Sequence, residues 1–204
     1  AAPAFDPALV VQRGQQPLAW FCLCAEPLPM VPPGRLPKAL AVRPRWDASS
    51  YESAFAQVQT LLHEGETYQV NLTFPLEVEG ETADFWMRCR EARFGAWIVT
   101  DDTEILSASP EGFLGWEDGQ IWSEPMKGTR PTPEIEDLAS SAKDRAENLM
   151  IVDMIRNDLG RVCEAGSVCV PQLFRIEAHP TVAQMTSLIR GRTSAGFREL
   201  LMAT

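Results

Sequence analysis

The sequence predicts a fold that combines α-helices with β-strands, and three observations support this prediction. Apolar residues recur every three or four positions over residues 47–64 and 139–159, which is the spacing of amphipathic helices. Runs of β-forming residues at 96–99 and 104–108 lie between these two segments. The sequence Glu117-Asp118-Gly119-Gln120 is a turn signal between two further β-forming runs, so it predicts a hairpin.

Composition limits the classes of protein to which this chain can belong. The chain has 204 residues, of which 45% are hydrophobic, so it suits one domain, or part of a larger one, with a sizeable core. Its formal net charge of −10 argues against non-specific nucleic-acid binding and against attraction to an anionic membrane. No apolar run approaches the roughly 20 residues of a membrane span. We therefore expect neither nucleic acid nor membrane as a partner.

Cysteine usage favours a reducing compartment. The five cysteines are odd in number and include no C-x-x-C pair, and the two histidines, His63 and His179, lie far apart in the sequence. This pattern argues against a disulfide scaffold and against a zinc site. We expect a cytoplasmic protein in which each cysteine serves as a small apolar residue.

The N-terminal part of the sequence predicts a proline-rich connector followed by a helix. Residues 1–45 contain many prolines, and we interpret them as a connector with one predicted strand over residues 18–24. The first predicted helix follows, with Ser49 or Ser50 as its N-cap and Gly65 as its stop. Its buried stripe should consist of four apolar residues at helical spacing: Phe55, Val58, Leu61 and Leu62.

Residues 68–74 alternate in polarity and predict a strand. One face of this strand would be apolar, and the other would carry Gln69, Asn71 and Thr73. A face of amides and a hydroxyl could line a solvated pocket, or it could be an ordinary exposed face of a sheet, and the pattern leaves both open.

Shorter patterns predict the remaining elements. Gly95 should end a second helix that begins near Thr82, and two prolines predict a loop over residues 130–137. The C-terminal part should contain strands at 167–170 and 173–177, a partly alternating apolar stretch at 180–189 and the start of a helix at 197–202. Because the chain stops within this last helix without a cap, we expect a domain that is cut at its C-terminus.

The predicted hairpin brings an acid and an amine towards each other. Glu111 precedes its first strand and Lys127 follows its second, so both lie near the ends of paired segments. A carboxylic acid beside an amine suits proton transfer and nucleophilic chemistry. The alternative is a surface glutamate and a surface lysine beside an ordinary hairpin.

The longest predicted helix, at 139–159, carries a third candidate residue. Ser140 or Ser141 should cap it and Gly160 should end it. Glu147 falls on a partly apolar flank of this helix, where an isolated charge is costly. A metal ion or a cationic partner would offset that cost, and so would a salt bridge to Lys143 or Arg145. The predicted apolar stripe consists of Leu149, Val152, Ile155 and Leu159.

Six segments, taken together and in order, closely resemble the chorismate-utilising enzymes. The resemblance runs from about Trp46 to the C-terminus, and it implies an α+β fold of two packed antiparallel sheets with outer helices. It also implies that residues 46–204 form an incomplete chorismate-binding domain and that residues 1–45 are a remnant of an N-terminal domain. The segments are YQVNLT at 68–73, SPEGF at 109–113, PMKGTRP at 125–131, KDRAENL at 143–149, RNDLGR at 156–161 and PTVAQMTS at 180–187.

Three positions favour the branch of this family that aminates chorismate on the way to para-aminobenzoate and folate. That branch resembles this chain in having Lys127 where anthranilate and isochorismate synthases usually have alanine. Gln69, in the substrate-binding region, stands where isochorismate and salicylate synthases have a lysine, and Gln184 stands where anthranilate synthases more often have histidine. Anthranilate synthase, another chorismate lyase or isomerase, and a catalytically incomplete fragment of the fold remain alternatives.

The resemblance also implies a role for each candidate residue. Glu111 would be the acid that helps the chorismate hydroxyl to leave, and Lys127 would be the nucleophile that adds to the ring. The backbone N–H of Gly128 and the hydroxyl of Thr129 would hold the ring carboxylate, and Glu147 would bind Mg²⁺. A glutamine amidotransferase partner would supply ammonia.

The family continues beyond the segments found in this chain. It normally adds a Gly-Ala-Pro-Lys segment, a segment that binds the substrate and a second carboxylate for the metal ion. We therefore expect the 204-residue chain on its own to be inactive.

Overall fold

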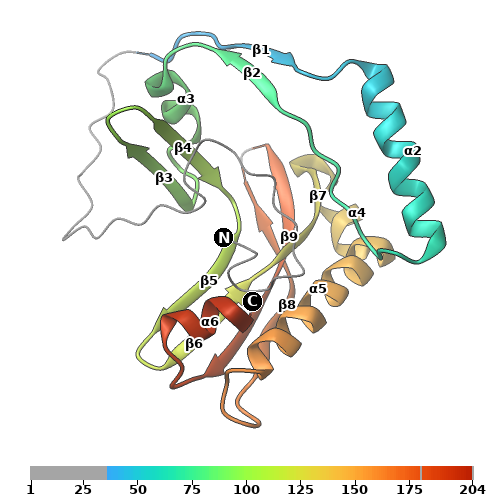
Figure 1. The fold of residues 1–204 in the computed structure, drawn as a ribbon, viewed down its shortest axis with the longest axis vertical. Coiled ribbons are helices and arrows are strands. Elements are labelled where there is room, and N and C mark those ends of the chain that lie inside the picture. The colour runs from blue at the N-terminus through green and yellow to red at the C-terminus, as the bar shows by residue number, and fades with distance from the viewer. Residues whose placement is uncertain (1–35, 180, 204) are drawn as a thin grey trace. The chain divides into compact units, whose positions relative to one another are not determined.

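The computed structural model describes residues 36–179 and 181–203 (Figure 1). They form two compact units, one within Pro29–Ala108 and one within Ser109–Thr204. The strand predicted at residues 18–24 lies outside the described residues. None of the helices in the described part of the chain combines the length and the apolarity that crossing a membrane requires.

The first unit contains two helices and two small sheets. In one sheet β1 pairs antiparallel with β2, and in the other β3 pairs with β4. Its elements, in chain order, are β1 (Ala41–Pro44), α2 (Ala48–Glu64), β2 (Leu76–Glu79), α3 (Thr82–Cys89), β3 (Phe94–Val99) and β4 (Glu104–Ser109). β1 thus falls within the stretch that the sequence indicates as a connector.

Helix α2 has the predicted length but not the predicted burial. Its N-cap is Asp47, whose carboxylate accepts a hydrogen bond from the Ser50 N–H at 2.8 Å, rather than either predicted serine. Gly65 ends the helix with φ of 77°, as expected. The predicted buried stripe is wrong, because Phe55 and Leu61 stay 46% and 42% exposed. Helical spacing identifies the apolar face of a helix, but burial also needs an element packed against that face.

The strand predicted over residues 68–74 is also wrong. This segment has no strand partner among the described residues, and the strand β2 begins only at Leu76. Alternation in polarity cannot reveal whether a hydrogen-bonded neighbour is present. Helix α3 likewise ends at Cys89, earlier than the predicted stop at Gly95, because Phe94 already begins β3.

The second unit is built on one five-stranded sheet with helices. Its elements are β5 (Gly112–Glu117), β6 (Gln120–Glu124), β7 (Met126–Pro131), a 3₁₀ turn (Thr132–Glu134), α4 (Ile135–Ser140), α5 (Ala142–Gly160), β8 (Cys169–Ala178), β9 (Val182–Arg192) and α6 (Phe197–Ala203). The predicted hairpin is confirmed as β5 and β6, which pair antiparallel. In its turn, Asp118 and Gly119 have positive φ values of 48° and 73°, which Asp-Gly turns favour.

Strand β9 is the centre of this sheet. β8 pairs with one edge of β9 from Ala183 to Arg190. β6 and β7 share the other edge, β6 with residues 189–192 and β7 with residues 182–186. The two strands predicted at 167–170 and 173–177 are therefore one strand, and part of the predicted loop at 130–137 is the helix α4.

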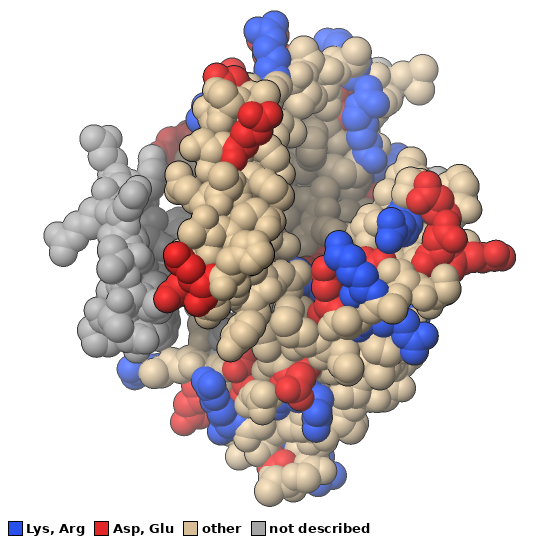
Figure 2. Space-filling model, turned by 90° about the vertical axis from the view of Figure 1, so that its right-hand side faces the viewer, with Lys and Arg blue, Asp and Glu red and all other residues tan. Residues whose placement is uncertain are grey.

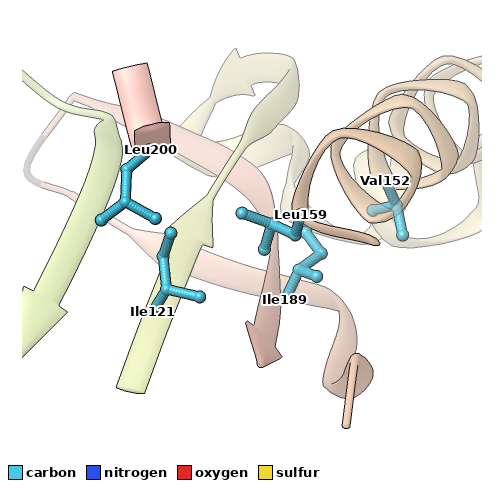
Figure 3. Close-up of a cluster of buried hydrophobic side chains, with 5 residues drawn as sticks. All are labelled: Ile121, Val152, Leu159, Ile189 and Leu200. Carbon is cyan, nitrogen blue, oxygen red and sulfur yellow. The ribbon is translucent and has the colours of Figure 1, made fainter. Parts of the chain in front are cut away.

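Apolar side chains from the helices and the sheet form the core of this unit. Figure 3 shows one cluster, in which Ile121 and Ile189 from the sheet meet side chains of α5 and α6. Full burial of one such side chain contributes roughly 1.5–3 kcal/mol. The five residues of this cluster are Ile121, Val152, Leu159, Ile189 and Leu200. A second cluster contains Leu138, Ala183 and Met185.

Helix α5 confirms most of its predicted features. Ser141, one of the two predicted caps, accepts a hydrogen bond from the Asp144 N–H, and Gly160 is the last helical residue. The predicted stripe is right at Val152 and Leu159 but wrong at Leu149, which is 51% exposed. The buried position on that turn belongs to Asn148.

Charged side chains are mixed on the surface. On the face of the molecule drawn in Figure 2, acidic and basic side chains lie among each other. Such a mixture produces no strong field of one sign.

Candidate active site

Glu111 lies at the open end of the β5–β6 hairpin. The strand register pairs Gly112 with Glu124, so the residue before β5 lies next to the end of β6. Oε1 of Glu111 accepts a hydrogen bond from the backbone N–H of Met126 at 2.9 Å. The carboxylate therefore contacts the residue that precedes Lys127, in agreement with the closeness that the hairpin predicts.

Strand β7 contains a bulge at its start. The ladder pairs Met126 with Thr186 and then Thr129 with Gln184, so two residues of β7 face a single residue of β9. A bulge of this kind bends the strand and redirects a side chain, and it is common beside active sites. The two bulged residues are Lys127 and Gly128.

Gly128 occupies a position that a side chain would not fit. Its φ is +90°, in the region that residues with a Cβ rarely adopt. A Cβ atom there would lie 3.0 Å from Cβ of Asp144 and 3.0 Å from Cδ1 of Leu138. The backbone of the bulge thus packs directly against helices α4 and α5, which fixes the position of the following residue, Thr129.

Lys127 is half-buried, and no ion pair joins it to any residue that the structure describes. Its amine is therefore not held by a carboxylate of the described part of the chain. An amine used as a nucleophile needs this freedom, because a permanent partner would hold it in the charged form. Lys127 meets that structural requirement.

Asp144 ties the bulged strand to helix α5. Its Oδ2 lies 3.1 Å from NH2 of Arg130 on β7, and its side chain is only 10% exposed. A hydrogen bond from Ser141 lowers the pKa of Asp144 below its usual value of 3.8, and Arg130 lowers it further, against the raising effect of burial. Asp144 therefore stays a carboxylate at neutral pH.

Glu147 lies one helical turn after Asp144 and is 35% exposed. Its contact is the predicted salt bridge to Lys143, but this pair is long, at 3.7 Å, and Lys143 is 79% exposed. A pair of this kind contributes little and is readily exchanged for another cation. Among the described residues no group of three or more His, Cys, Asp or Glu side chains could hold a metal ion.

This donor set fits Mg²⁺, though not a metal that needs a full cage of protein ligands. Mg²⁺ prefers hard oxygen ligands and commonly uses one or two carboxylates, with water and substrate oxygens in the other positions. The carboxylate of Glu147 can serve in this way, because it is partly exposed and its ion pair with Lys143 is weak. The role of Glu147 as a metal ligand stays a prediction.

Gln69 belongs to the other unit, Pro29–Ala108. Its side-chain oxygen Oε1 is buried and has no hydrogen-bond partner among the described groups. Such an atom is costly unless something else donates to it. Of the candidate residues, those that the structure brings together are Glu111, Lys127, Gly128 and Thr129.

Comparison with known proteins identifies the family. The model of the chorismate binding enzymes matches residues 6–204, almost the whole chain. The chain belongs to this family of chorismate binding enzymes. The resemblance that the six sequence segments indicate is thus confirmed.

Named relatives of this chorismate binding chain include aminodeoxychorismate synthases. Aminodeoxychorismate synthase component 1 of Salmonella typhimurium is 45% identical over 158 residues, which are 70% of this chain and 34% of that protein. Aminodeoxychorismate synthase of Streptomyces pristinaespiralis is 42% identical over 83% of this chain and 25% of that protein. The chain thus spans about a third or less of the length of the curated relatives it matches.

Solved structures of the family share the fold. Anthranilate synthase component I of Streptococcus pneumoniae superposes with a TM-score of 0.72 at 27% identity, over 84% of this chain and 41% of that one. A putative isochorismate synthase of Bacillus anthracis, at 19% identity and a TM-score of 0.68, shows the same fold over 81% of this chain and 50% of that one. The predicted α+β class is confirmed.

Two groups of buried or partly buried polar residues in this chorismate binding chain were not predicted from the sequence. One joins Asn148 on α5 to Ser187 on β9. The other is an ion cluster in which Arg175 on β8 contacts both Glu124 and Glu177. The signal for Asn148 was present, because it is a polar residue four positions before Val152 on the buried face, but an apolar pattern search passes over it.

Proposed function

We propose that this protein aminates chorismate to 4-amino-4-deoxychorismate, the first step towards para-aminobenzoate and folate. The observation that carries the proposal is the half-buried amine of Lys127, which forms no ion pair with any described residue. It lies in a bulge next to Met126, whose N–H donates to Glu111. The names of the curated relatives agree with it.

The proposed reaction uses Lys127 and Glu111 in two exchanges. In the first, Nζ of Lys127 forms a bond to the chorismate ring while the C–O bond of the ring hydroxyl breaks. Glu111 donates the proton with which that hydroxyl leaves as water, and then takes back a proton from the new secondary ammonium. This exchange requires that Nζ of Lys127 and the carboxyl group of Glu111 both reach the same substrate ring.

In the second exchange, ammonia bonds to the ring while the bond to Nζ breaks. Glu111 donates a proton to the departing Nζ and recovers one from the new ring ammonium, so both residues return to their starting state. The ammonia would come from a glutamine amidotransferase partner. Several relatives are named "component 1", which supports the existence of a partner component.

Binding of the substrate would use the bulge and helix α5. Gly128 N–H and the hydroxyl of Thr129 would hold the ring carboxylate, since the bulge fixes both residues against the helix. Glu147 would hold a Mg²⁺ ion, which when bound would withdraw electron density through the ring carboxylate. Gln69 would be a further substrate-binding residue, as its position in the first of the six segments implies.

The proposal places the reaction in the cytoplasm. In support, the three cysteines in the described part of the chain, Cys89, Cys163 and Cys169, are all free thiols. Free cysteines are usual in a reducing compartment.

The test uses the complete gene product with chorismate, Mg²⁺ and an ammonium salt. The expected product is 4-amino-4-deoxychorismate, identified by chromatography and mass, and the Lys127→Ala variant should lose most of its formation while still binding chorismate. Anthranilate as the product would show instead that the protein is a lyase of the anthranilate synthase kind. Unchanged turnover in Lys127→Ala would exclude Lys127 as the nucleophile.

A further inference from the structure

We propose that Asn148, through its hydrogen bond with Ser187, is a positioning residue that orients the carboxylate of Glu147. This inference rests on the proposed function, in which Glu147 binds Mg²⁺. It concerns a buried polar contact that the proposed reaction does not use directly.

The buried face of α5 changes from polar to apolar along its length. Near the C-terminal end this face consists of Val152 and Leu159, and near the N-terminal end it consists of Asp144 and Asn148. Asn148 is 0% exposed, at a position where a leucine would bury well. A buried amide is costly unless both of its groups are hydrogen-bonded, so its presence requires a reason.

Both groups of the Asn148 amide have partners on the central strand β9. Nδ2 donates to the backbone oxygen of Met185 at 3.1 Å, and Oδ1 accepts from the Ser187 hydroxyl at 2.6 Å. The amide thus spans two alternate residues of one strand. Such an arrangement allows a single rotation and a single axial position of α5, whereas apolar contacts tolerate small shifts.

The contact continues beyond Ser187 into strand β8 and into Pro125, the residue that joins β6 to β7. The Ser187 hydroxyl accepts from the Phe174 N–H on β8 at 3.1 Å, and the Ser187 N–H donates to the oxygen of Pro125 at 3.1 Å. Phe174 has φ of +58°, an uncommon conformation that is held in place by such contacts. Pro125 lies two residues before Lys127.

Asn148 also meets β9 at the point where both neighbours are irregular. The bulge of β7 faces Met185, and β8 is irregular opposite Ser187, where two of its residues face one. Asn148 contacts these same two residues of β9, Met185 and Ser187. Its side chain therefore connects the helix that carries Glu147 with the strand opposite the bulge of β7.

Glu147 needs this support because its own contacts do not hold it. Among the residues that the structure describes, its one ion pair is a long one, to the exposed Lys143. Mg²⁺ demands near-ideal octahedral geometry at about 2.0–2.1 Å, so a small rotation of α5 would displace the carboxylate from a productive position. Asn148 is the next residue of the helix, and its two hydrogen bonds to β9 hold it in place.

The experiment compares two variants of this contact with a matched control in the complete gene product. Ser187→Ala removes one hydroxyl, and Asn148→Leu replaces the amide by an apolar side chain of similar size. The control is Thr193→Val, because Thr193 is also buried and its hydroxyl donates to the Val162 oxygen at 2.6 Å, just beyond the far end of α5. Calorimetry gives the Mg²⁺ affinity of each variant, and urea unfolding gives its stability.

We expect Asn148→Leu to weaken Mg²⁺ binding by about 10–100-fold, as loss of a residue that orients a metal ligand typically does. Ser187→Ala should weaken it less, and Thr193→Val should lose stability but keep the Mg²⁺ affinity of the parent. If Asn148→Leu and Ser187→Ala both kept the Mg²⁺ affinity of the parent, the role of Asn148 would be overturned while the role of Glu147 would stand. The same would follow if Thr193→Val lost as much Mg²⁺ affinity as Asn148→Leu. A parent protein that binds no Mg²⁺ would overturn the metal role of Glu147 and the inference together.

Discussion

The carboxylate of Glu111 accepts a hydrogen bond from the backbone N–H of Met126 at 2.9 Å. This bond is made by Oε1, so it does not use Oε2. A glutamine at this position could still accept the bond but could not perform the proton transfer that we propose for Glu111.

Glu111→Gln should therefore separate structure from catalysis. We expect kcat to fall by roughly 10²–10⁴-fold, the usual contribution of a general acid or base. The free energy of unfolding should stay close to that of the parent, because the glutamine oxygen can still accept from Met126. Steady-state kinetics and urea unfolding measure the two effects. Glu117→Gln, in the turn of the same hairpin, is the control, and an equal loss of kcat there would count against the assignment.

Gly128→Ala should destabilise the second unit. A Cβ atom would lie 3.0 Å from both Asp144 and Leu138, and the positive φ adds backbone strain, so we expect a loss of roughly 1–3 kcal/mol or more. The control is Gly166→Ala, since Gly166 has φ of +78° but nothing within 4 Å of its added Cβ. Urea unfolding should show a smaller loss for the control. Equal losses would mean that the packing of the bulge against α4 and α5 contributes nothing.

Glu147→Gln should weaken Mg²⁺ binding by about 10–100-fold, as changes close to a metal site often do. The fold should persist, because a neutral amide on that flank is easier to accommodate than an unpaired carboxylate. Lys143→Met is the control, since it removes only the 3.7 Å ion pair. Titration calorimetry measures the Mg²⁺ affinity. The same affinity in Glu147→Gln and in the parent would contradict the assignment of Glu147 as a metal ligand.

Ser141→Ala should destabilise the protein in a pH-dependent way. It removes the cap of α5, a loss of about 0.5–2 kcal/mol, and the largest influence that lowers the pKa of Asp144. A lowered pKa contributes stability above the unfolded value, near 3.8, and that contribution disappears as the pH falls through the folded value.

The difference in unfolding free energy between parent and Ser141→Ala should accordingly narrow as the pH falls below about 4. Urea unfolding at several pH values between 6 and 3 measures it. Ser140→Ala is the control, because the Ser140 hydroxyl bonds only to backbone oxygens of α4. A difference that is constant over this pH range would show that Ser141 acts as a cap alone.

Local signals predicted the parts of the fold that depend on neighbours in the sequence. The Asp118-Gly119 turn and the stop at Gly65 depend on backbone conformations that few other residues adopt, so they were predictable. The closeness of Glu111 to the segment of Lys127 followed from the hairpin. The family resemblance supplied the roles, which the residues alone left open.

What could not be predicted depends on contacts between distant segments. The apolar pattern of α5 does not show that Asn148 rather than Leu149 faces the sheet, because the polar partner that Asn148 needs, Ser187, lies on the distant strand β9. The bulge at Lys127 is likewise visible only once β7 is paired with β9. The apolar face of α2 was evident from its spacing, but spacing does not identify what covers a face.

The central place of β9 has a consequence for the order in which the second unit can assemble. β5 with β6, and β8 with β9, are hairpins between sequence neighbours, and hairpins form within about 1–10 μs. β7 has β9 as its strand partner, so it can pair only after the hairpin of β8 and β9 has formed. Pairings between segments distant in the sequence are slow. Pulsed hydrogen exchange during refolding should find the backbone of β7 protected after both hairpins. The bulge that holds Lys127 would then be among the last features to form, so a chain released too early would have both hairpins but not the bulge that positions Lys127.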